Sequence, residues 1–422
     1  MDRDASISVH LLASPTQRHS TAVAEATIMC SAIVSIWSLH IVREGVTPRI
    51  LNKEIFLLVA LALAAFGIFV FTRTMAAREQ QMEVRIARIW YEKGRAYMAS
   101  SKIEKAIEAF RRSIAGTRYN QKYALALADA LTAGNHDAEA QQSLLRLRES
   151  DPDNAEINIY LARLASKRGE TSDAVRYYQN ALYGRWTGSQ IDVRRRQLRV
   201  ELIHFLLGHQ ERNLAISELL ILETELPNAA ISWIETAKLF IEAEDLQHAL
   251  KDYSAASRLD SHNVEALTGA GETSFQLGDY IKAKQYLRAS LNLDPQSEKT
   301  SQLLSLTDMV LADDPLAPHL TAAERQGRLM PDFERSLQRL ESCLDQNSSS
   351  ETNAGLQSLK TEALAMEPKL SQRKPLPDSD MVEAGTNLIF RMQKAVSDSC
   401  GETSDPDQAL ILIGLLHNGA RQ

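Results

Sequence analysis

Alanines recur at a fixed interval through the middle of the chain. Ala106, Ala140 and Ala174 are 34 residues apart, and Ala215, Ala249 and Ala283 repeat that interval. Each alanine is followed after four positions by a large apolar residue, and most are preceded by a small one. The large residues are Phe110, Leu144, Tyr178, Leu219, Tyr253 and Leu287; the small ones are Gly94, Ala128, Ala162, Ala237 and Gly271. Because helices approach closely only where side chains are small, this pattern predicts stacked pairs of antiparallel helices.

Prolines mark the ends of several of these pairs. Pro152, Pro227 and Pro295 stand where the second helix of a pair should stop, and a residue without an N–H terminates a helix. The units then begin near Ala87, Gln121, Ala155, Arg196, Ala230 and Val264. Arg118, Trp186 and Ser261 replace the proline in the other units, and Ile203 replaces the small residue of the fourth. These departures concern the packing of single helices and leave the series intact.

The interval and its key positions resemble the tetratricopeptide repeat family, whose unit is a helix–turn–helix of 34 residues. The first unit matches best, with Trp90, Gly94, Tyr97, Ala106 and Phe110 in IWYEKGRAYMASSKIEKAIEAFRRSI; the sixth, GAGETSFQLGDYIKAKQYLRASLNLDP, is also close. The resemblance covers half of the chain. It implies an all-α fold, with a superhelical solenoid of six units over residues 87–297. It also implies a non-catalytic scaffold that binds a partner protein or peptide in the groove lined by its first helices.

Helical spacing predicts which residues face this groove. The early units offer basic and aromatic side chains and the late units mostly acidic ones, so the groove should run from basic to acidic. The alternative is an ordinary solvated helix face. No clamp for a partner's terminal carboxylate is expected, because Tyr91, Arg95 and Ala126 stand where its first residues would be. The predicted groove residues are Arg88, Tyr91, Arg95, Lys122, Arg163, Lys238, Glu242, Glu265 and Glu272.

A second strong pattern is the apolar run from Ile55 to Phe71, which has no charged residue. As a helix it is about 25 Å long, near the short end for a membrane span, and the flanking Lys53 and Arg73 can reach the headgroups. A buried core helix and a cleaved signal peptide are the alternatives. The weaker stretch at 26–39 (ATIMCSAIVSIWSL) is either an interfacial helix or a second span.

These patterns divide the chain into six parts. After Pro295 a helix should cap the solenoid, and helical patterns without the 34-residue interval follow at 321–345, 352–367, 380–398 and 406–416. The predicted parts are a tail with the weak helix (1–54), a transmembrane helix (55–72), a helical connector (73–86), the six units (87–297), a capping helix (298–314) and a C-terminal helical region (315–422).

Composition adds little chemistry. The net charge of −7 gives no general attraction to nucleic acid. The chain has no CxxC, HExxH or GxSxG motif, and we expect neither cofactor nor metal. GAGETS, from Gly269 to Ser274, only faintly resembles a phosphate loop, and helix crossing already explains Gly271. The arginine cluster Arg194, Arg195, Arg196 and Arg199 binds phosphate or anionic lipid, or else forms the solvated first turn of a helix; the second interpretation is favoured.

Two cysteines bear on the compartment. Cys343 and Cys400 could form a disulfide if this part faces an oxidising compartment, and would be buried thiols otherwise. With a single span they favour repeats outside the cytoplasm, as in a bacterial periplasm, although the arginines after the span count against this. We therefore expect a membrane-anchored scaffold, similar in architecture to bacterial envelope-assembly and cytochrome-maturation factors. The alternative is an envelope-processing factor or enzyme whose active part is 315–422, with the repeats as substrate receptor.

Overall fold

The structure is a computed structural model that describes residues 48–115, 120–346, 353–401 and 403–419. Its regular structure consists of 17 helices, α2 to α18, and the described residues form no strand beyond one isolated bridge between Asn154 and Arg185. The predicted all-α fold is confirmed. The predictions for the N-terminal tail and the stretch 26–39 lie outside the described residues. The chain divides into two compact units, residues 1–134 and 135–422.

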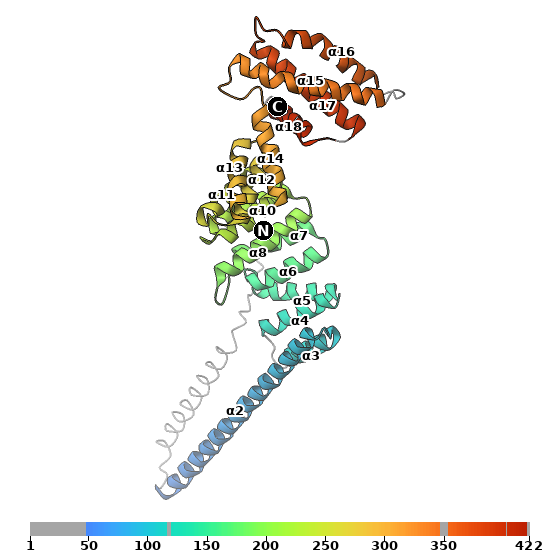
Figure 1. The fold of residues 1–422 in the computed structure, drawn as a ribbon. Helices are drawn as coiled ribbons and strands as arrows, with labels where there is room; N and C mark the ends of the chain where they lie inside the picture. The colour runs from blue at the N-terminus through green and yellow to red at the C-terminus, as the bar shows by residue number, and fades with distance from the viewer. Residues whose placement is uncertain (1–47, 116–119, 347–352, 402, 420–422) are drawn as a thin grey trace, which may run out of the picture. The chain divides into compact units, whose positions relative to one another are not determined.

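The first unit is built on one long helix, α2 (Pro48–Ala99), of 52 residues (Figure 1). It contains the apolar run, the predicted connector and the first helix of the first repeat without a break. The sequence explains this continuity, because no proline and a single glycine, Gly67, interrupt residues 49–93. By length and composition this helix could cross a membrane.

Two further helices, α3 (Ile103–Ala115) and α4 (Gln121–Ala133), complete the first unit. The predicted crossing is present: a Cβ on Gly94 would lie 2.5 Å from the Phe110 ring, so only glycine lets α3 approach this closely. Aromatic rings fill the space beside the crossing. The Tyr91 ring stacks on Tyr123, with centroids 4.7 Å apart, and is tilted against Phe110.

The second unit begins with helices of repeat length, in which consecutive helices pack against each other. Asparagines start several of them: the Asn154 side chain accepts the backbone N–H groups of Glu156 and Ile157, and Asn263 accepts that of Ala266. The helices are α5 (Asp137–Ser150), α6 (Ala155–Lys167), α7 (Thr171–Tyr183), α8 (Ile191–Gly208), α9 (Arg212–Glu225), α10 (Ala230–Glu242), α11 (Leu246–Leu259), α12 (Val264–Gln276) and α13 (Tyr280–Leu293).

Helix α8 departs from the other first helices of this unit. It has 18 residues, whereas α6, α10 and α12 each have 13, and it follows the loop at Gly184 and Gly188 where the sequence has extra residues. Ile203, which replaces the expected small residue, is fully buried against Leu219 and Phe240. The fourth unit therefore packs a large side chain where the others have a small one.

The last helices form a bundle: α14 (Glu298–Asp313), α15 (Ala322–Gln346), α16 (Asn353–Leu370), α17 (Ser379–Cys400) and α18 (Asp405–Gly419). Helix α14 packs against α13 on one side and α18 on the other. Tyr280 of α13 and Val310 of α14 belong to the same apolar core as Phe333 and Met392 of the bundle. The helix expected to cap the repeats thus shares a core with the region that follows.

Candidate functional site

All nine predicted groove residues lie on first helices of the repeats, and in the second unit four of the five charged ones form an ion pair with a neighbouring first helix. Arg163 on α6 donates two hydrogen bonds of 2.8 Å to Glu201 on α8, which also accepts the Tyr178 hydroxyl at 2.9 Å. Burial alone would raise the pKa of Glu201, but the hydrogen bond and charge of Arg163 outweigh it and lower that pKa. Arg163 therefore ties two units together.

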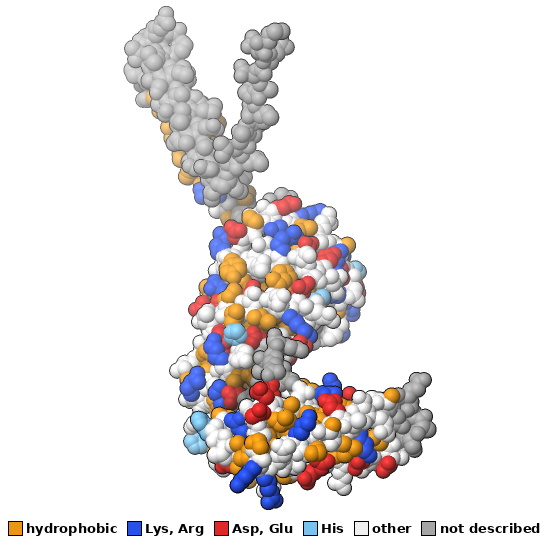
Figure 2. Space-filling view, turned by 90° about the horizontal axis from the view of Figure 1, so that it is seen from above, with side chains coloured by type: hydrophobic (Ala, Val, Ile, Leu, Met, Phe, Trp, Pro, Cys, Tyr) orange, Lys and Arg blue, Asp and Glu red, His pale blue; other side chains and the backbone are white. Residues whose placement is uncertain are grey.

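The same arrangement recurs further along. Lys238 on α10 lies 2.5 Å from Glu265 on α12, and Glu272 on α12 lies 2.6 Å from Lys299 on α14. Three of the four pairs of neighbouring first helices between α6 and α14 are thus joined by ion pairs. These ion pairs neutralise most of the charges that were predicted to change from basic to acidic along the groove. Figure 2 shows positive and negative side chains interspersed on the face in view.

In the first unit the predicted residues have different environments. Tyr91 is only 7% exposed, so it belongs to the core and does not offer its ring to a ligand. The Lys122 ammonium lies 5.1 Å from the centroid of that ring, a cation–π contact. Arg95 is exposed, and Arg88 lines a shallow recess of about 440 Å³ on α2 together with Ile89 and Ala96.

The remaining pair of first helices, α8 and α10, is separated by an open recess of about 650 Å³, which we call the α8–α10 recess. Among the described residues no ion pair joins these two helices. The C-terminal end of α9 lies beneath them. The lining residues are Val193, Arg196, Gln197, Val200 and His204 of α8, Leu222, Leu226 and Pro227 at the end of α9, and Ser232, Glu235, Thr236, Lys238, Leu239 and Glu242 of α10.

The α8–α10 recess combines an apolar floor with a charged rim. Leu222 and Leu239 are buried beneath it, whereas His204, Glu235 and Glu242 are exposed at its edges. An open apolar hollow with polar groups around it is suited to hold one apolar side chain of a partner and to orient its backbone. Of the nine predicted groove residues, the structure brings only Lys238 and Glu242 together at this place.

A larger recess, of about 720 Å³, lies elsewhere in the second unit. It is formed by the C-terminal ends of the second helices α5 and α7, and its lining is largely polar. Arg185 in its wall already pairs with Asp151. We therefore place the candidate site in the α8–α10 recess, which lies between first helices.

The favoured interpretation of the arginine cluster is wrong for Arg199. That side chain is 1% exposed, and its guanidinium pairs with Glu218 and, at 3.2 Å, with Glu225. Arg194 pairs with Glu156 at 3.0 Å and lies over the Trp186 ring. The signal for Arg199 was its spacing: it is followed by Leu202 and Leu206 at intervals of three and four, which places it on the buried face of α8. Arg196 lines the recess.

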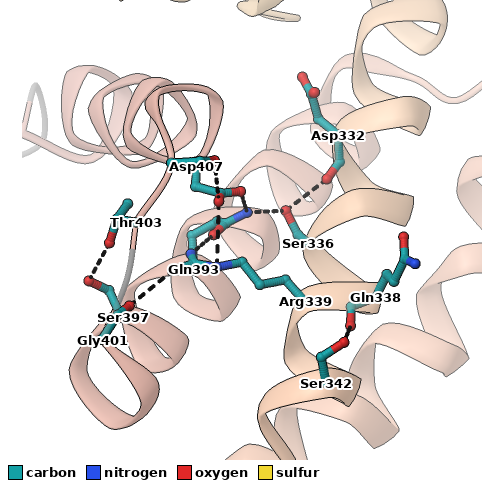
Figure 3. Close-up of polar contacts among 11 residues, drawn as sticks. Asp332, Ser336, Gln338, Arg339, Ser342, Gln393, Ser397, Gly401, Thr403 and Asp407 are labelled. Carbon is teal, nitrogen blue, oxygen red and sulfur yellow. Dashed lines mark hydrogen bonds and ion pairs between the residues drawn. The ribbon is translucent and has the colours of Figure 1, made fainter.

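The C-terminal bundle, proposed as an alternative active part, has a polar cluster between its helices (Figure 3). Gln393 is fully buried and donates to Ser336 at 3.0 Å and to Asp407 at 3.1 Å, while Arg339 donates to the side-chain amide oxygen Oε1 of Gln393. Arg339 also donates to the Gly401 carbonyl at 3.3 Å. These groups satisfy one another, so the cluster holds α15, α17 and α18 together and offers no free functional group to a substrate.

Beside this cluster, Cys343 on α15 and Cys400 at the end of α17 are bonded as a disulfide, with Cα atoms 6.0 Å apart. Two buried carboxyls, Asp252 outside this cluster and Asp332 within it, have raised pKa values. Burial raises the pKa of Asp252 to about 8, assisted by the neighbouring Glu223, and raises that of Asp332 to about 7. Neither lines the recess, so we interpret both as structural. No cluster of potential metal ligands is found within the described ranges.

Two family models described as tetratricopeptide repeat match residues 87–115 and 264–297, and residues 125–189. Their matches include the first and the last of the predicted units.

Several solved structures are similar to this chain, and some of them are described as TPR proteins. YrrB, described as a TPR protein with an unusual peptide-binding site, is 17% identical, with a TM-score of 0.34, over 46% of this chain and 97% of its own. PilW, described as a type IV pilus biogenesis factor, is 18% identical, with a TM-score of 0.34, over 52% and 98%. The C-terminal part of a TPR repeat-containing protein from Cytophaga hutchinsonii is 16% identical, with a TM-score of 0.40, over 57% and 98%. Because these TM-scores lie below 0.5, the likeness carries no argument about this chain.

Proposed function

This chain is a tetratricopeptide repeat protein, and from that premise we propose that it is a membrane-anchored, non-catalytic scaffold that binds an extended segment of a partner protein in the α8–α10 recess. One observation carries the proposal. Between α6 and α14, the recess occupies the one junction of first helices that is left open, whereas ion pairs tie the other three.

The chemistry of the recess indicates what kind of segment would bind. Leu222, Leu226 and Leu239 favour an apolar side chain, because its burial removes apolar surface from water. Arg196 on the α8 rim and Glu235 and Glu242 on the α10 rim present opposite charges on the two sides. A partner segment with an acidic residue on one side of its apolar anchor and a basic residue on the other would match both rims.

The anchoring part of the proposal depends on α2. Every residue of the run Ile55–Phe71 is exposed in the chain, and exposed apolar surface of this extent is suited to lipid rather than water. We place the repeats outside the cytoplasm, because the Cys343–Cys400 disulfide suits an oxidising compartment. We propose that the chain is non-catalytic for two reasons. Tetratricopeptide repeats usually bind proteins, and the buried polar side chains of the C-terminal bundle bond to one another.

A matched pair of variants tests the recess. Val193, which lines the recess, and Ile231, which does not, are both exposed β-branched residues, at 40% and 54%. The soluble part, residues 79–422, carrying either Val193→Asp or Ile231→Asp is used to capture partners from detergent-solubilised membranes of the source cell. We expect Val193→Asp to lose at least about tenfold of the captured partner, because a desolvated carboxylate opposes an apolar anchor, and Ile231→Asp to retain it. Equal capture by both variants would place the site elsewhere.

A further inference from the structure

The part of α2 that precedes the first repeat has no packing partner among the described residues. Every residue from 55 to 86 is exposed, including 72–86 beyond the apolar run, and burial begins at Ala87. A lone helix of about 15 residues is marginal in water, because packing supplies most of the stability of helices in proteins. This segment should therefore be covered by something outside the described fold.

Apolar residues follow one another along this helix at intervals of seven. The series begins in the apolar run and continues through the connector into the first repeat, with Ile86 between two of its members. Its members are Leu61, Ile68, Met75, Met82, Ile89 and Ala96, and the first five are 50–65% exposed. A coiled-coil seam has apolar residues at two positions of every seven, and each side chain fits between those of a facing helix. This series supplies one of the two positions in every heptad, and beyond the apolar run Ile86 supplies the other position in one heptad.

This seam does not compete with the packing of the first repeat. Ala87 and Tyr91 are buried against the repeat, whereas Ile89 between them is 54% exposed and points away from it. The shallow apolar recess lined by Ile89, Lys93 and Ala96 lies on the same face of the helix. The helix can therefore carry the repeat on one face and a partner helix on the other.

We propose that the partner is a second copy of this chain, which pairs with the first through a parallel two-stranded coiled coil along α2. The proposal goes beyond ligand binding and rests on the proposed span. Two copies anchored in one membrane cross it in the same direction, which brings their seams parallel and in register. Their confinement in the bilayer also raises their effective concentration.

The charges beside the seam fit this pairing. Each heptad has a second seam position three residues before its member of the apolar series, such as Glu79. In a parallel coiled coil the residue just before that position faces the residue five places further along the partner. Arg78 of one copy then faces Glu83 of the other, and the symmetry makes this contact twice. Thr72, Glu79 and Lys93 occupy seam positions that are apolar in strong coiled coils, so the pairing is weak enough to depend on the shared membrane.

Cysteine cross-linking in native membranes tests the proposal. The full chain, with Cys30 replaced by serine, carries either Met82→Cys on the seam or Val84→Cys nearly opposite it; the two native side chains are 54% and 49% exposed. After mild oxidation we expect at least about tenfold more covalent dimer from Met82→Cys, because its two sulfurs meet across the seam. Equal amounts of covalent dimer from the two variants would overturn the proposal. A product in which the Met82→Cys chain is linked to another protein, or a chain that stays monomeric, would also overturn it.

Charge reversal adds a test that depends on the identity of the partner. In the Met82→Cys chain, Arg78→Glu or Glu83→Arg alone should reduce the dimer several-fold, because like charges then face each other. The double variant Arg78→Glu/Glu83→Arg should restore it, since each contact again joins opposite charges. Failure of the double variant to recover would contradict a parallel pair of identical helices. The membrane fraction of each variant is measured alongside, so a failed span is distinguished from a failed dimer.

Discussion

Glycine at the helix crossings is the clearest case in which one atom decides the packing. A Cβ on Gly271 would lie 2.7 Å from Cδ2 and 3.2 Å from the backbone nitrogen of Leu287, its predicted partner in the same unit. This contact also contradicts a phosphate loop at GAGETS, because Gly271 lies inside helix α12. The small and large positions could be read from the sequence because both lie within one unit.

We expect Gly271→Ala to destabilise the second unit by about 1–3 kcal/mol, because the added methyl group forces α12 away from Leu287. Gly208→Ala is the matched control. It makes the same change in helix α8, where nothing lies within 4 Å of the added Cβ, and should be neutral or stabilise by up to about 1 kcal/mol. Thermal unfolding of the soluble part gives both values. An equal loss at both positions would show that helix α12 does not cross at Gly271.

The buried Asp252 makes stability depend on pH. Its ordinary pKa in an unfolded chain is about 3.9, and in the folded chain burial and Glu223 raise the pKa to about 8. The folded state therefore binds the proton more tightly, and stability falls as pH rises from about 4 to about 8, by at most about 1.4 kcal/mol per pH unit from this group.

Asp252→Asn should flatten this fall, because the amide carries no charge at any of these pH values. Asp332, whose folded pKa is raised to about 7, contributes a slope of its own that remains in this variant and ends near pH 7. Asp192→Asn changes a carboxylate that is 85% exposed and should keep the profile of the unchanged chain. Denaturant midpoints at pH 5, 6, 7 and 8 provide the comparison, and an unchanged slope in Asp252→Asn would contradict the raised pKa.

At the scale of elements, the first residues of the helices were more predictable from the sequence than the contacts between neighbouring helices. Helices α4, α6, α10 and α12 begin at the residues where the sequence places units two, three, five and six, because small residues and prolines repeat within each unit. The burial of Arg199 and of Tyr91 was not predicted, since it depends on which side chains a neighbouring helix presents. The α8–α10 recess was missed for the same reason: it arises from the longer α8.

The Arg199 contact fastens α8 to α9 inside the fourth unit. Arg199→Met should cost about 3–5 kcal/mol, because it leaves the buried Glu218 without its counter-charge. The double variant Arg199→Met/Glu218→Leu should recover most of this loss. Arg212→Met breaks an exposed pair with Glu244 and should cost less than about 1 kcal/mol. Chemical denaturation measures all three; a double variant no more stable than Arg199→Met would show that the buried charge is not the cause.

The disulfide fastens α15 to α17 at the other end of the second unit. It closes a loop with a sequence separation of 57, which in the chain-entropy model corresponds to about 4 kcal/mol of stabilisation. Reduction should therefore lower the unfolding midpoint of the bundle. Free-thiol labelling of the chain taken from its own membrane, with and without reductant, tests whether the bond forms there. If Cys343 and Cys400 both react fully without reductant, the proposed oxidising compartment loses its main support.

For the whole molecule, the sequence could predict two patterns that are each local: the 34-residue interval and the apolar run. It could not predict that α14 shares a core with the bundle, because residues as distant as Tyr280 and Met392 contribute to that core. Nor could it show that Lys238 and Glu265, both expected to face a ligand, pair with each other.

The apolar run leads to a prediction about the intact chain. High-pH carbonate should leave the full chain in the membrane pellet, and deletion of residues 1–78 should release it, because Ile55–Phe71 is then lost. Replacing Leu61 and Leu63, which are 63% and 66% exposed, by lysine should also release it, since each lysine at the centre of a span costs about 2.5–3.5 kcal/mol. Release of the unchanged chain by carbonate alone would show that the segment does not span.

The unbroken course of α2 has a geometric consequence. Each residue of an α-helix adds about 1.5 Å of height and about 100° of rotation. The residues between Phe71 and Ala87 therefore fix both the elevation of the first repeat, about 24 Å beyond the apolar run, and its azimuth about the helix axis. Inserting one residue in this stretch would rotate the first repeat about the helix axis by more than a quarter turn. Inserting seven residues would raise the repeat by about 10 Å and return it close to its original orientation. The length of the connector thus sets the rotation of the first repeat about the helix axis, as well as its height above the apolar run.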